Sequence, residues 1–244
     1  MAAAERWTTR SGPRLRYLDN APAEPEGLPI LFAPGLSDLA DEYLDTLDHF
    51  GPRRVLVAEV RGRGASEAPD SGYTVSDQAD DLQAVLDEEG IDRFHLMTFS
   101  RGTSWGLELA LRAPGRVASL AIGDYKAVEV HLPETFVDWQ MGTTFRGRPM
   151  EQRIDRRVLE QIVEASVARE LWDELTAIEA PLLVARPGGE GGILSDESVD
   201  RYREVRPDVE VVVIPDAPHD LFRPDRLAYP RAVIDFLRRR CPGE

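Results

Sequence analysis

The sequence predicts an α/β fold in which a mostly parallel central sheet is flanked by helices and carries a small helical cap insertion. Short apolar runs alternate with amphipathic segments along most of the 244 residues. The runs are apolar throughout rather than at every second residue, which is typical of strands buried on both faces. One stretch, residues 126–177, interrupts the alternation with helical patterns and no convincing strand, and so long an excursion is usually a separate structural unit.

Six apolar runs are the expected strands of the sheet, and they cover residues 28–34, 53–60, 94–99, 116–124, 181–187 and 209–216. The amphipathic segments between them are the expected crossover helices, at residues 38–50, 74–90, 105–113, 195–205 and 226–240. Residues 6–10 and 14–19 are expected to form a leading hairpin. We therefore predict a core from residues 1–125 and 178–244, with a cap at 126–177.

Composition excludes several classes of function. The net charge is −15 and acidic and basic residues are interspersed, which argues against nucleic acid or an anionic membrane as a partner. No stretch approaches the roughly 20 apolar residues of a membrane span, and the N-terminus lacks a signal-peptide core, so we expect a cytoplasmic protein with a small-molecule substrate. Cys241 is the only cysteine, so neither an internal disulfide nor a cysteine metal cluster is expected. No metal or cofactor is expected, and a homodimer is left open.

Ser100 is the candidate nucleophile. It lies in TFSRGTS, directly after a buried-strand pattern and directly before a helix pattern, where a sharp turn lifts a serine hydroxyl above the sheet. Small residues are needed two positions before and after the serine. Gly102 meets that demand, whereas Thr98 meets it less well. The alternative is that Ser100 only caps the helix.

A hydroxyl needs a base to become a nucleophile, and the chain offers four histidines. His219 follows the last expected strand and precedes the final helix, at the sheet edge where ligands bind in open α/β folds. His95 lies inside the strand before Ser100, His49 lies at a helix end, and His131 opens the cap with no strand to position it. His219 is therefore the expected base.

The order of these pieces resembles the α/β-hydrolase superfamily: FAPGLSD after an early strand, VRGRGASEAP after the next, the TFSRGTS turn, a helical insertion, and a late HDLF histidine. The likeness runs from about residue 14 to 238. It implies an α/β-hydrolase fold, and an oxyanion hole made by the backbone N–H groups of Leu36 and Arg101. The sequence departs from many relatives at Pro34, where they carry histidine before Gly35, and at Arg63, where they also carry histidine.

The resemblance places the triad acid most often after the penultimate strand, but the chain has Gly191 and Gly192 there. Asp124, at the end of the strand over residues 116–124, is the expected substitute, because some superfamily members carry their acid after that strand. Glu190 is the alternative acid, and a chain without a functional acid is the third reading. Asp196 suits a helix cap better.

These residues predict a serine hydrolase that cleaves a small or medium hydrophobic ester, lactone or thioester through Ser100, His219, Asp124 and an acyl-enzyme. Phe136, Trp139, Phe145 and Trp172 are candidates for an apolar substrate pocket in the cap, or alternatively for the packed core of the cap. Arg146 and Arg148 are weaker candidates for an acidic substrate group. Two rival functions remain: a non-hydrolytic lyase or tailoring enzyme of secondary metabolism on the same fold, and a ligand-binding member without catalysis.

Overall fold

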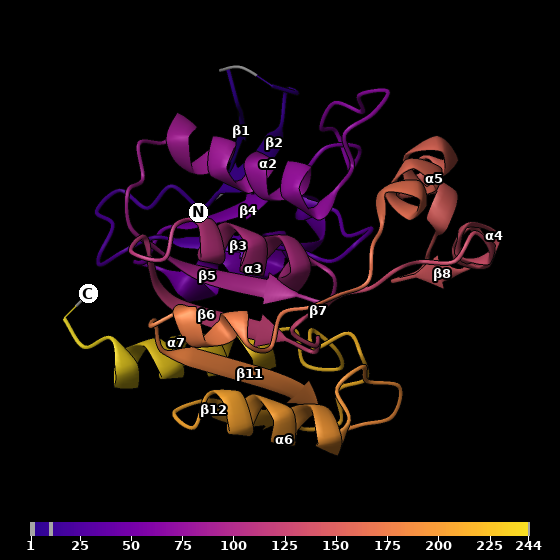
Figure 1. The fold of residues 1–244 in the computed structure, drawn as a ribbon. Coiled ribbons are helices and arrows are strands. Elements are labelled where there is room, and N and C mark those ends of the chain that lie inside the picture. The colour runs from indigo at the N-terminus through magenta and orange to yellow at the C-terminus, as the bar shows by residue number, and fades with distance from the viewer. Residues whose placement is uncertain (1–2, 10–11, 244) are drawn as a thin grey trace.

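The computed structural model describes residues 3–9 and 12–243, and it has an eight-stranded sheet at its centre (Figure 1). The strands lie in the order β1-β2-β4-β3-β5-β6-β11-β12. Their bounds are Ala4–Trp7 for β1, Arg16–Asp19 for β2, Ile30–Ala33 for β3, Val55–Ala58 for β4, Phe94–Phe99 for β5, Val117–Gly123 for β6, Leu182–Pro187 for β11 and Glu210–Ile214 for β12. The six predicted strands are all present.

The sheet is mostly parallel, as predicted. From β4 through β12 every neighbouring pair is parallel, whereas β1 pairs with β2 and β2 with β4 in antiparallel fashion. The predicted hairpin is thus formed by β1 and β2, although Arg10, the last residue of its expected first arm, lies outside the described residues. The ends of the predicted core at residues 1, 2 and 244 lie outside them as well.

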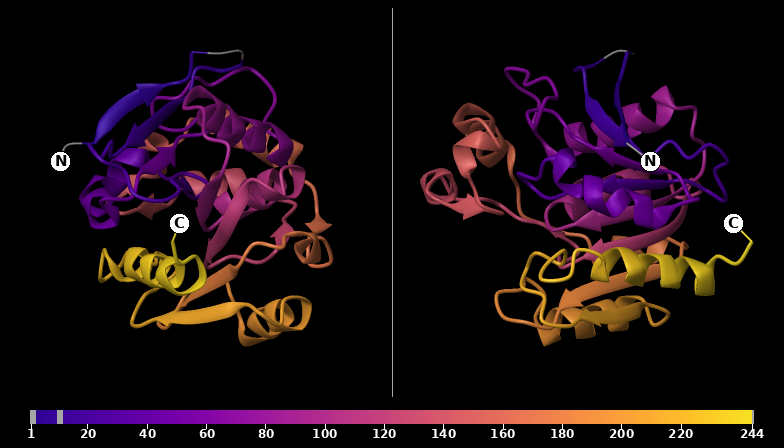
Figure 2. Two further views of the ribbon diagram at one scale, coloured as in Figure 1. Left: turned by 90° about the vertical axis from the view of Figure 1, so that its left-hand side faces the viewer. Right: turned by 180° about the vertical axis from the view of Figure 1, so that it is seen from behind.

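Helices cover both faces of the sheet, which explains why its strands are apolar without alternation (Figure 2). The helices are α1 at Leu44–Leu47, α2 at Val75–Glu88, α3 at Gly102–Arg112, α6 at Asp196–Val205 and α7 at Ala228–Arg240. Buried side chains of α2, α3 and α6 form one hydrophobic core with the sheet, and those of α1 and α7 form a second on the opposite face. Neighbouring positions of β3 show the division, because Leu31 belongs to the first core and Phe32 to the second.

The single helix predicted at residues 38–50 is not formed. It is broken into a 3-10 turn η1 at Ala40–Tyr43, the short α1, and a second 3-10 turn η2 at Asp48–Phe50. Tyr43, Leu47 and Phe50 still face the core. Apolar spacing alone fits one continuous helix here, and it does not distinguish a helix from a series of short turns that bury the same side chains.

Residues 126–177 add no strand to the eight-stranded sheet, and all of them are described. They contain α4 at Thr135–Met141, α5 at Arg156–Ala165 and 3-10 turns η3 at Met150–Gln152 and η4 at Glu174–Ala177. They also hold four two-residue strands, β7 at Val128–Glu129, β8 at Thr144–Phe145, β9 at Arg148–Pro149 and β10 at Arg169–Glu170. The expectation of no strand was therefore wrong in detail, because two-residue strands leave no periodic pattern.

The small strands shape the insertion. β7 pairs with β10, which joins the segment that leaves the core to the segment that returns, and β8 pairs with β9 as a hairpin. In Figure 1, α4, β8 and α5 of the insertion lie on the side toward which the arrowheads of β5 and β6 point, that is, beyond the carboxyl ends of these strands. Within the described residues, no helix is long and apolar enough to cross a membrane.

Candidate active site

Ser100 lies between β5 and α3 with a φ of +51°, a left-handed conformation that is uncommon outside glycine. Its backbone N–H donates to the carbonyl of Gly123 at 2.8 Å, which fixes the turn to the neighbouring strand β6. The helix-cap alternative is not what the structure has, because Arg101 occupies the position before α3 and makes no side-chain cap bond. Ser100 is held in a strained turn at the edge of the sheet.

The two small positions around Ser100 are explained by close packing. A Cβ atom on Gly102 would lie 2.2 Å from the carbonyl oxygen of Ala33, so no larger residue fits there without movement of the loop after β3. Thr98 is fully buried, and its hydroxyl lies 2.9 Å from that of Thr103. Its methyl group uses space left by Gly106, where a Cβ atom would come within 2.7 Å of Thr98 Cγ2. A glycine in α3 therefore makes room for the threonine.

His219 and Asp124 complete a hydrogen-bonded chain with Ser100. The Nε2 atom of His219 lies 2.9 Å from Ser100 Oγ, and its Nδ1 atom lies 2.6 Å from Asp124 Oδ2. Because a carboxylate only accepts, Nδ1 carries the proton and Nε2 is free to accept the serine proton. This is the geometry by which a histidine activates a hydroxyl. All four histidines are described, and His219 is the one that meets Ser100.

Asp124 is fully buried and lies at a φ of +44° at the end of β6. Besides the histidine, its carboxylate accepts the backbone N–H groups of Ile193, at 3.0 Å, and Leu194, at 2.9 Å. The loop after β11, which has Gly191 and Gly192 at the usual position of the acid, therefore supplies two backbone donors to Asp124. Glu190, the alternative acid, is exposed in that same loop.

Phe99, the last residue of β5, also contacts the histidine. Its ring is buried and stacks on the imidazole of His219 with centroids 5.2 Å apart at 27°. The strand residue before the serine thus orients the base. A stacking partner 120 positions away has no signature in sequence, so this contact was missed.

Leu36 and Arg101, whose backbone N–H groups are the expected oxyanion donors, line the same cavity as Ser100. In the described part of the chain neither amide donates to a protein acceptor, so both remain available to a ligand oxygen. The loop of Leu36 is fixed from both sides. Asp38 accepts the N–H of Gly35 at 2.8 Å, and Arg63 Nε donates to the carbonyl of Leu36 at 3.0 Å.

Arg63 stands where many superfamily members carry histidine, and it is 1% exposed. Its guanidinium also donates to the carbonyl of Arg61 at 2.6 Å and to the side chain of Gln78. Burial without a contacting carboxylate lowers the pKa of Arg63 to about 9. A long side chain thus spans from the second loop to the oxyanion loop.

The cavity next to Ser100 and His219 has a volume of about 460 Å³, and most of its lining is apolar. Phe136, Trp139 and Phe145 line it as predicted from the sequence, and all three come from the insertion. Trp139 is 64% exposed, which places it at the mouth of the cavity.

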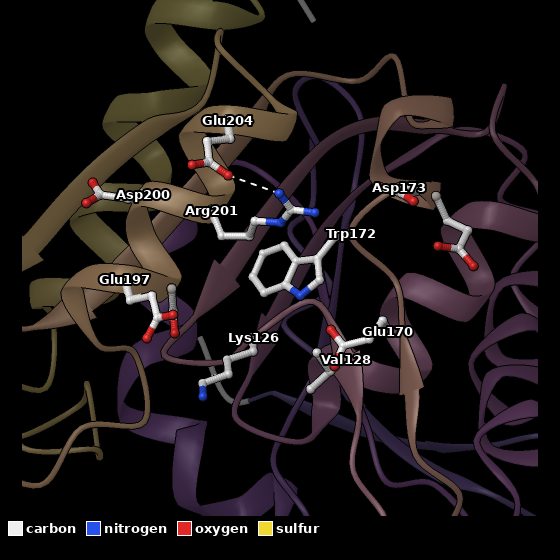
Figure 3. Close-up of a pocket in the computed structure, with 11 residues that line it drawn as sticks. Lys126, Val128, Glu170, Trp172, Asp173, Glu197, Asp200, Arg201 and Glu204 are labelled. Atoms are coloured by element: carbon white, nitrogen blue, oxygen red, sulfur yellow. Dashed lines mark hydrogen bonds and ion pairs between the residues drawn. The ribbon is translucent and has the colours of Figure 1, made fainter.

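Trp172 does not line this cavity, and that part of the prediction is corrected. Its ring packs edge-on against Tyr202 of α6, with centroids 4.8 Å apart, and it lines a different cavity next to Arg201 (Figure 3). The segment after β10 has already returned to the core at this point, and Trp172 packs against the same hydrophobic core as Tyr202 of α6. Sequence position within the insertion could not reveal that.

Arg146 is not free to meet a substrate. Its guanidinium makes a bidentate ion pair with Asp220, at 2.7 and 2.8 Å, and its side chain is 4% exposed. Although burial alone would raise the pKa of the Asp220 carboxyl, Arg146 holds it below its usual value. Glu42 lies 3.2 Å from Arg146 and also pairs with Arg153, at 2.6 Å. These ion pairs tie the insertion to the histidine loop and to η1, whereas Arg148 is exposed.

Within residues 3–9 and 12–243, no group of three or more histidine, cysteine, aspartate or glutamate side chains is placed to hold a metal ion.

Comparison with known proteins supports the α/β-hydrolase fold. Residues 29–147 match the family model for the alpha/beta hydrolase fold. The chain is 38% identical over 112 residues to the protein named "Putative carbamate hydrolase RutD" of Variovorax paradoxus, a match that covers 44% of this chain and only 41% of that relative. It is 25% identical over 243 residues to N-formylmaleamate deformylase of Pseudomonas putida. This match covers 87% of this chain and 89% of that relative.

The fold comparison covers nearly the whole chain. The crystal structure of the enol-lactonase from Burkholderia xenovorans superposes with a TM-score of 0.77 over 95% of this chain and 99% of the other, at 22% sequence identity. The named relatives are hydrolases. The match over residues 29–147 and the superposition both show that the chain has the α/β-hydrolase fold.

Proposed function

We propose that the protein is a serine hydrolase that cleaves a small or medium hydrophobic ester, lactone or thioester through an acyl-enzyme. The observation that carries the proposal is the unbroken chain of hydrogen bonds from Asp124 through His219 to Ser100, at 2.6 and 2.9 Å. Ser100 would attack the carbonyl carbon while Nε2 of His219 takes the hydroxyl proton. His219 then returns that proton to the leaving group, and a water molecule, activated by the same nitrogen, releases the acid.

The free amides of Leu36 and Arg101 support this chemistry. A tetrahedral intermediate carries a negative oxygen, and two backbone N–H groups without a protein acceptor can stabilise such a charge where they lie next to it. The ties from Asp38 and Arg63 hold the Leu36 loop in place before the substrate arrives. Pre-organised donors of this kind supply a large part of the rate enhancement in acyl transfer.

The size and lining of the cavity support the substrate class. A volume of about 460 Å³ suits a small or medium molecule, and the aromatic side chains of Phe136 and Phe145 favour an apolar acyl or leaving group. The relatives named as a carbamate hydrolase and a deformylase indicate that carbonyl carbons bonded to nitrogen belong in the same screen.

Burst kinetics test the proposal. With 4-nitrophenyl esters from acetate to octanoate, an acyl-enzyme mechanism predicts that release of one equivalent of nitrophenol precedes the steady state, and that acid-quenched protein carries the acyl mass on Ser100. Ser100→Ala should remove both signals. If turnover of an identified substrate needs Ser100 but no acyl adduct ever forms, the lyase alternative is correct instead. Binding without any turnover would select the non-catalytic alternative.

A further inference from the structure

The side chain of Arg101 is buried in the wall of the catalytic cavity without a carboxylate partner. The residue is 5% exposed and lines the cavity next to Ser100. Its Nε atom is buried and has no hydrogen-bond acceptor, and its Nη1 atom reaches the carbonyl of Val130 only at 3.4 Å. Within the described residues, no carboxylate oxygen lies within the 4 Å of an ion pair. Most of the donors of this guanidinium are therefore unused.

Other buried arginines of this chain are treated differently. The other arginines with buried side chains each contact a carboxylate side chain or several oxygen acceptors of the protein. They are Arg16, Arg61, Arg63, Arg146, Arg153 and Arg206. Burial of a cation without a partner destabilises the folded protein by several kcal/mol. The other buried arginines avoid this penalty, which suggests that the unused donors of Arg101 serve a function. Arg101 is exceptional in this respect.

Nearby acidic groups do not fill the gap. Asp38 lines the same cavity, but its carboxylate accepts from Gly35 N–H and from the hydroxyl of Tyr43, at 2.6 Å. Burial raises the pKa of the Glu129 carboxyl, and Arg101 opposes that rise through space, beyond contact distance. Asp124 is occupied by His219 and two backbone amides. Arg101 therefore has no carboxylate partner among the described residues.

We propose that Arg101 binds an anionic group of the substrate, and that the substrate is an acyl compound that carries a carboxylate. The inference rests on the proposed hydrolase function and narrows its substrate class. A guanidinium presents its donors in a planar fork that matches a carboxylate. The remainder of the cavity is apolar, so the substrate joins one carboxylate to a short hydrocarbon portion and the scissile carbonyl. Arg101 then serves twice, with its amide at the oxyanion and its side chain at the carboxylate.

A matched pair of esters tests this. 4-Nitrophenyl butanoate and mono-4-nitrophenyl succinate share the leaving group and differ in a terminal carboxylate. We expect the wild type to prefer the succinate in kcat/KM by about tenfold or more. Arg101→Met keeps the backbone amide and should abolish that preference, mainly through KM, and Arg101→Lys should retain part of it. Arg148→Met, in the exposed β9, is the control and should leave the preference intact. An equal preference in wild type and Arg101→Met would overturn the proposal.

Two further readouts separate this proposal from the hydrolase function. Titration calorimetry with glutarate measures the anion site without turnover, and Arg101→Met should weaken binding at least about tenfold. If neither ester is cleaved but glutarate binds in an Arg101-dependent manner, hydrolysis fails and the anion site stands. If esters are cleaved but glutarate does not bind and the preference is absent, the anion site fails and hydrolysis stands. Arg101→Met should also unfold at the same or a higher urea concentration than wild type, whereas a structural arginine would lower it.

Discussion

The imidazole Nδ1 of His219 lies 2.6 Å from the buried carboxylate of Asp124, although the two residues are 95 positions apart in the chain. Asp124 ends β6, and His219 follows β12, two strands farther along the sheet. Strand β11 lies between β6 and β12, so the side chains of Asp124 and His219 meet across the carboxyl end of β11. The loop after β11 does not interfere, because its glycines let the backbone fold over Asp124.

Gly192 is the residue that makes this approach possible. A Cβ atom there would lie 2.2 Å from Pro187 Cγ and 3.5 Å from Asp124 Oδ1. The N–H groups that follow it, of Ile193 and Leu194, bind the carboxylate. The position where relatives more often place an acid is used here to hold an acid that comes from another strand.

Gly102→Ala tests the close packing of the turn. Its methyl group would meet the carbonyl of Ala33 at 2.2 Å, so the oxyanion loop must move. We expect a loss of about 1–3 kcal/mol in the free energy of unfolding, together with slower covalent labelling of Ser100. Gly115→Ala is the matched control, because nothing lies within 4 Å of its Cβ position. Equal urea midpoints for the two variants would contradict this account of the turn.

Thr98 and Gly106 should be coupled. Gly106→Ala alone places a methyl group 2.7 Å from Thr98 Cγ2 and should destabilise the protein by about 1–3 kcal/mol. Thr98→Ser removes that methyl and keeps the hydroxyl. In the serine background, Gly106→Ala should instead stabilise by about 0.5–1 kcal/mol, because alanine favours a helix interior over glycine. The double-mutant cycle in urea measures the coupling, and additive effects would refute the contact.

The Arg146 ion pairs should stabilise the fold and position the histidine loop. Arg146→Gln leaves the buried carboxylates of Asp220 and Glu42 without this cation, and we expect a loss of about 3 kcal/mol in the free energy of unfolding. Arg148→Gln, two residues away but exposed, is the control and should change it by less than about 0.5 kcal/mol. A loss of the same size in both variants would mean that burial of the pair is not what matters.

His95 should make stability depend on pH. Burial, with a smaller effect of Arg53 and Arg93, lowers the pKa of His95 from 6.5 to about 4. Its Nδ1 atom lies 2.9 Å from Ser119 Oγ, and its Nε2 atom is buried and has no hydrogen-bond partner among the residues that the structure describes. The unfolded chain binds a proton below pH 6.5 whereas the folded chain does not, so stability is full above pH 6.5 and falls as the pH drops toward 4. The total loss from this residue is about 3 kcal/mol.

His95→Asn checks that assignment. Asparagine keeps a polar atom near Ser119 but does not titrate, so the fall in urea stability between pH 6.5 and 4 should become shallower in the variant. Labelling of Ser100 at neutral pH should be unaffected, because His95 lies at the opposite end of β5. An unchanged pH dependence would show that His95 is not the titrating group.

Much of the fold follows from the sequence, because buried parallel strands and amphipathic helices impose patterns on their residues. The juxtaposition of Ser100, His219 and Asp124 could also be predicted, because each residue follows a strand and the carboxyl ends of parallel strands meet at one edge of the sheet. The predictions that were wrong concern features that depend on tertiary packing. Trp172 packs on α6 rather than in the cavity, and the helix expected at residues 38–50 is broken into short turns.

Hydrogen bonds of the backbone, and contacts between residues far apart in the chain, could not be predicted from the sequence. The amides that hold Asp124 belong to Ile193 and Leu194, whose side chains give no sign of that role. Arg146 forms its ion pair with Asp220, which lies 74 positions away in the chain. The sequence predicts a role for the backbone amide of Arg101 alone, because the burial of its side chain without a carboxylate partner among the described residues depends on the fold.

The central claim is that Asp124 and His219 activate Ser100, and covalent labelling tests it most directly. Intact-mass and peptide-mapping analysis after incubation with a fluorophosphonate, under identical conditions, compares wild type with His219→Ala and Asp124→Asn. We predict a single adduct on Ser100 of the wild type, formed at least about a hundredfold more slowly in both variants. No adduct on the folded wild type, or an adduct that forms equally fast in all three proteins, would contradict the claim.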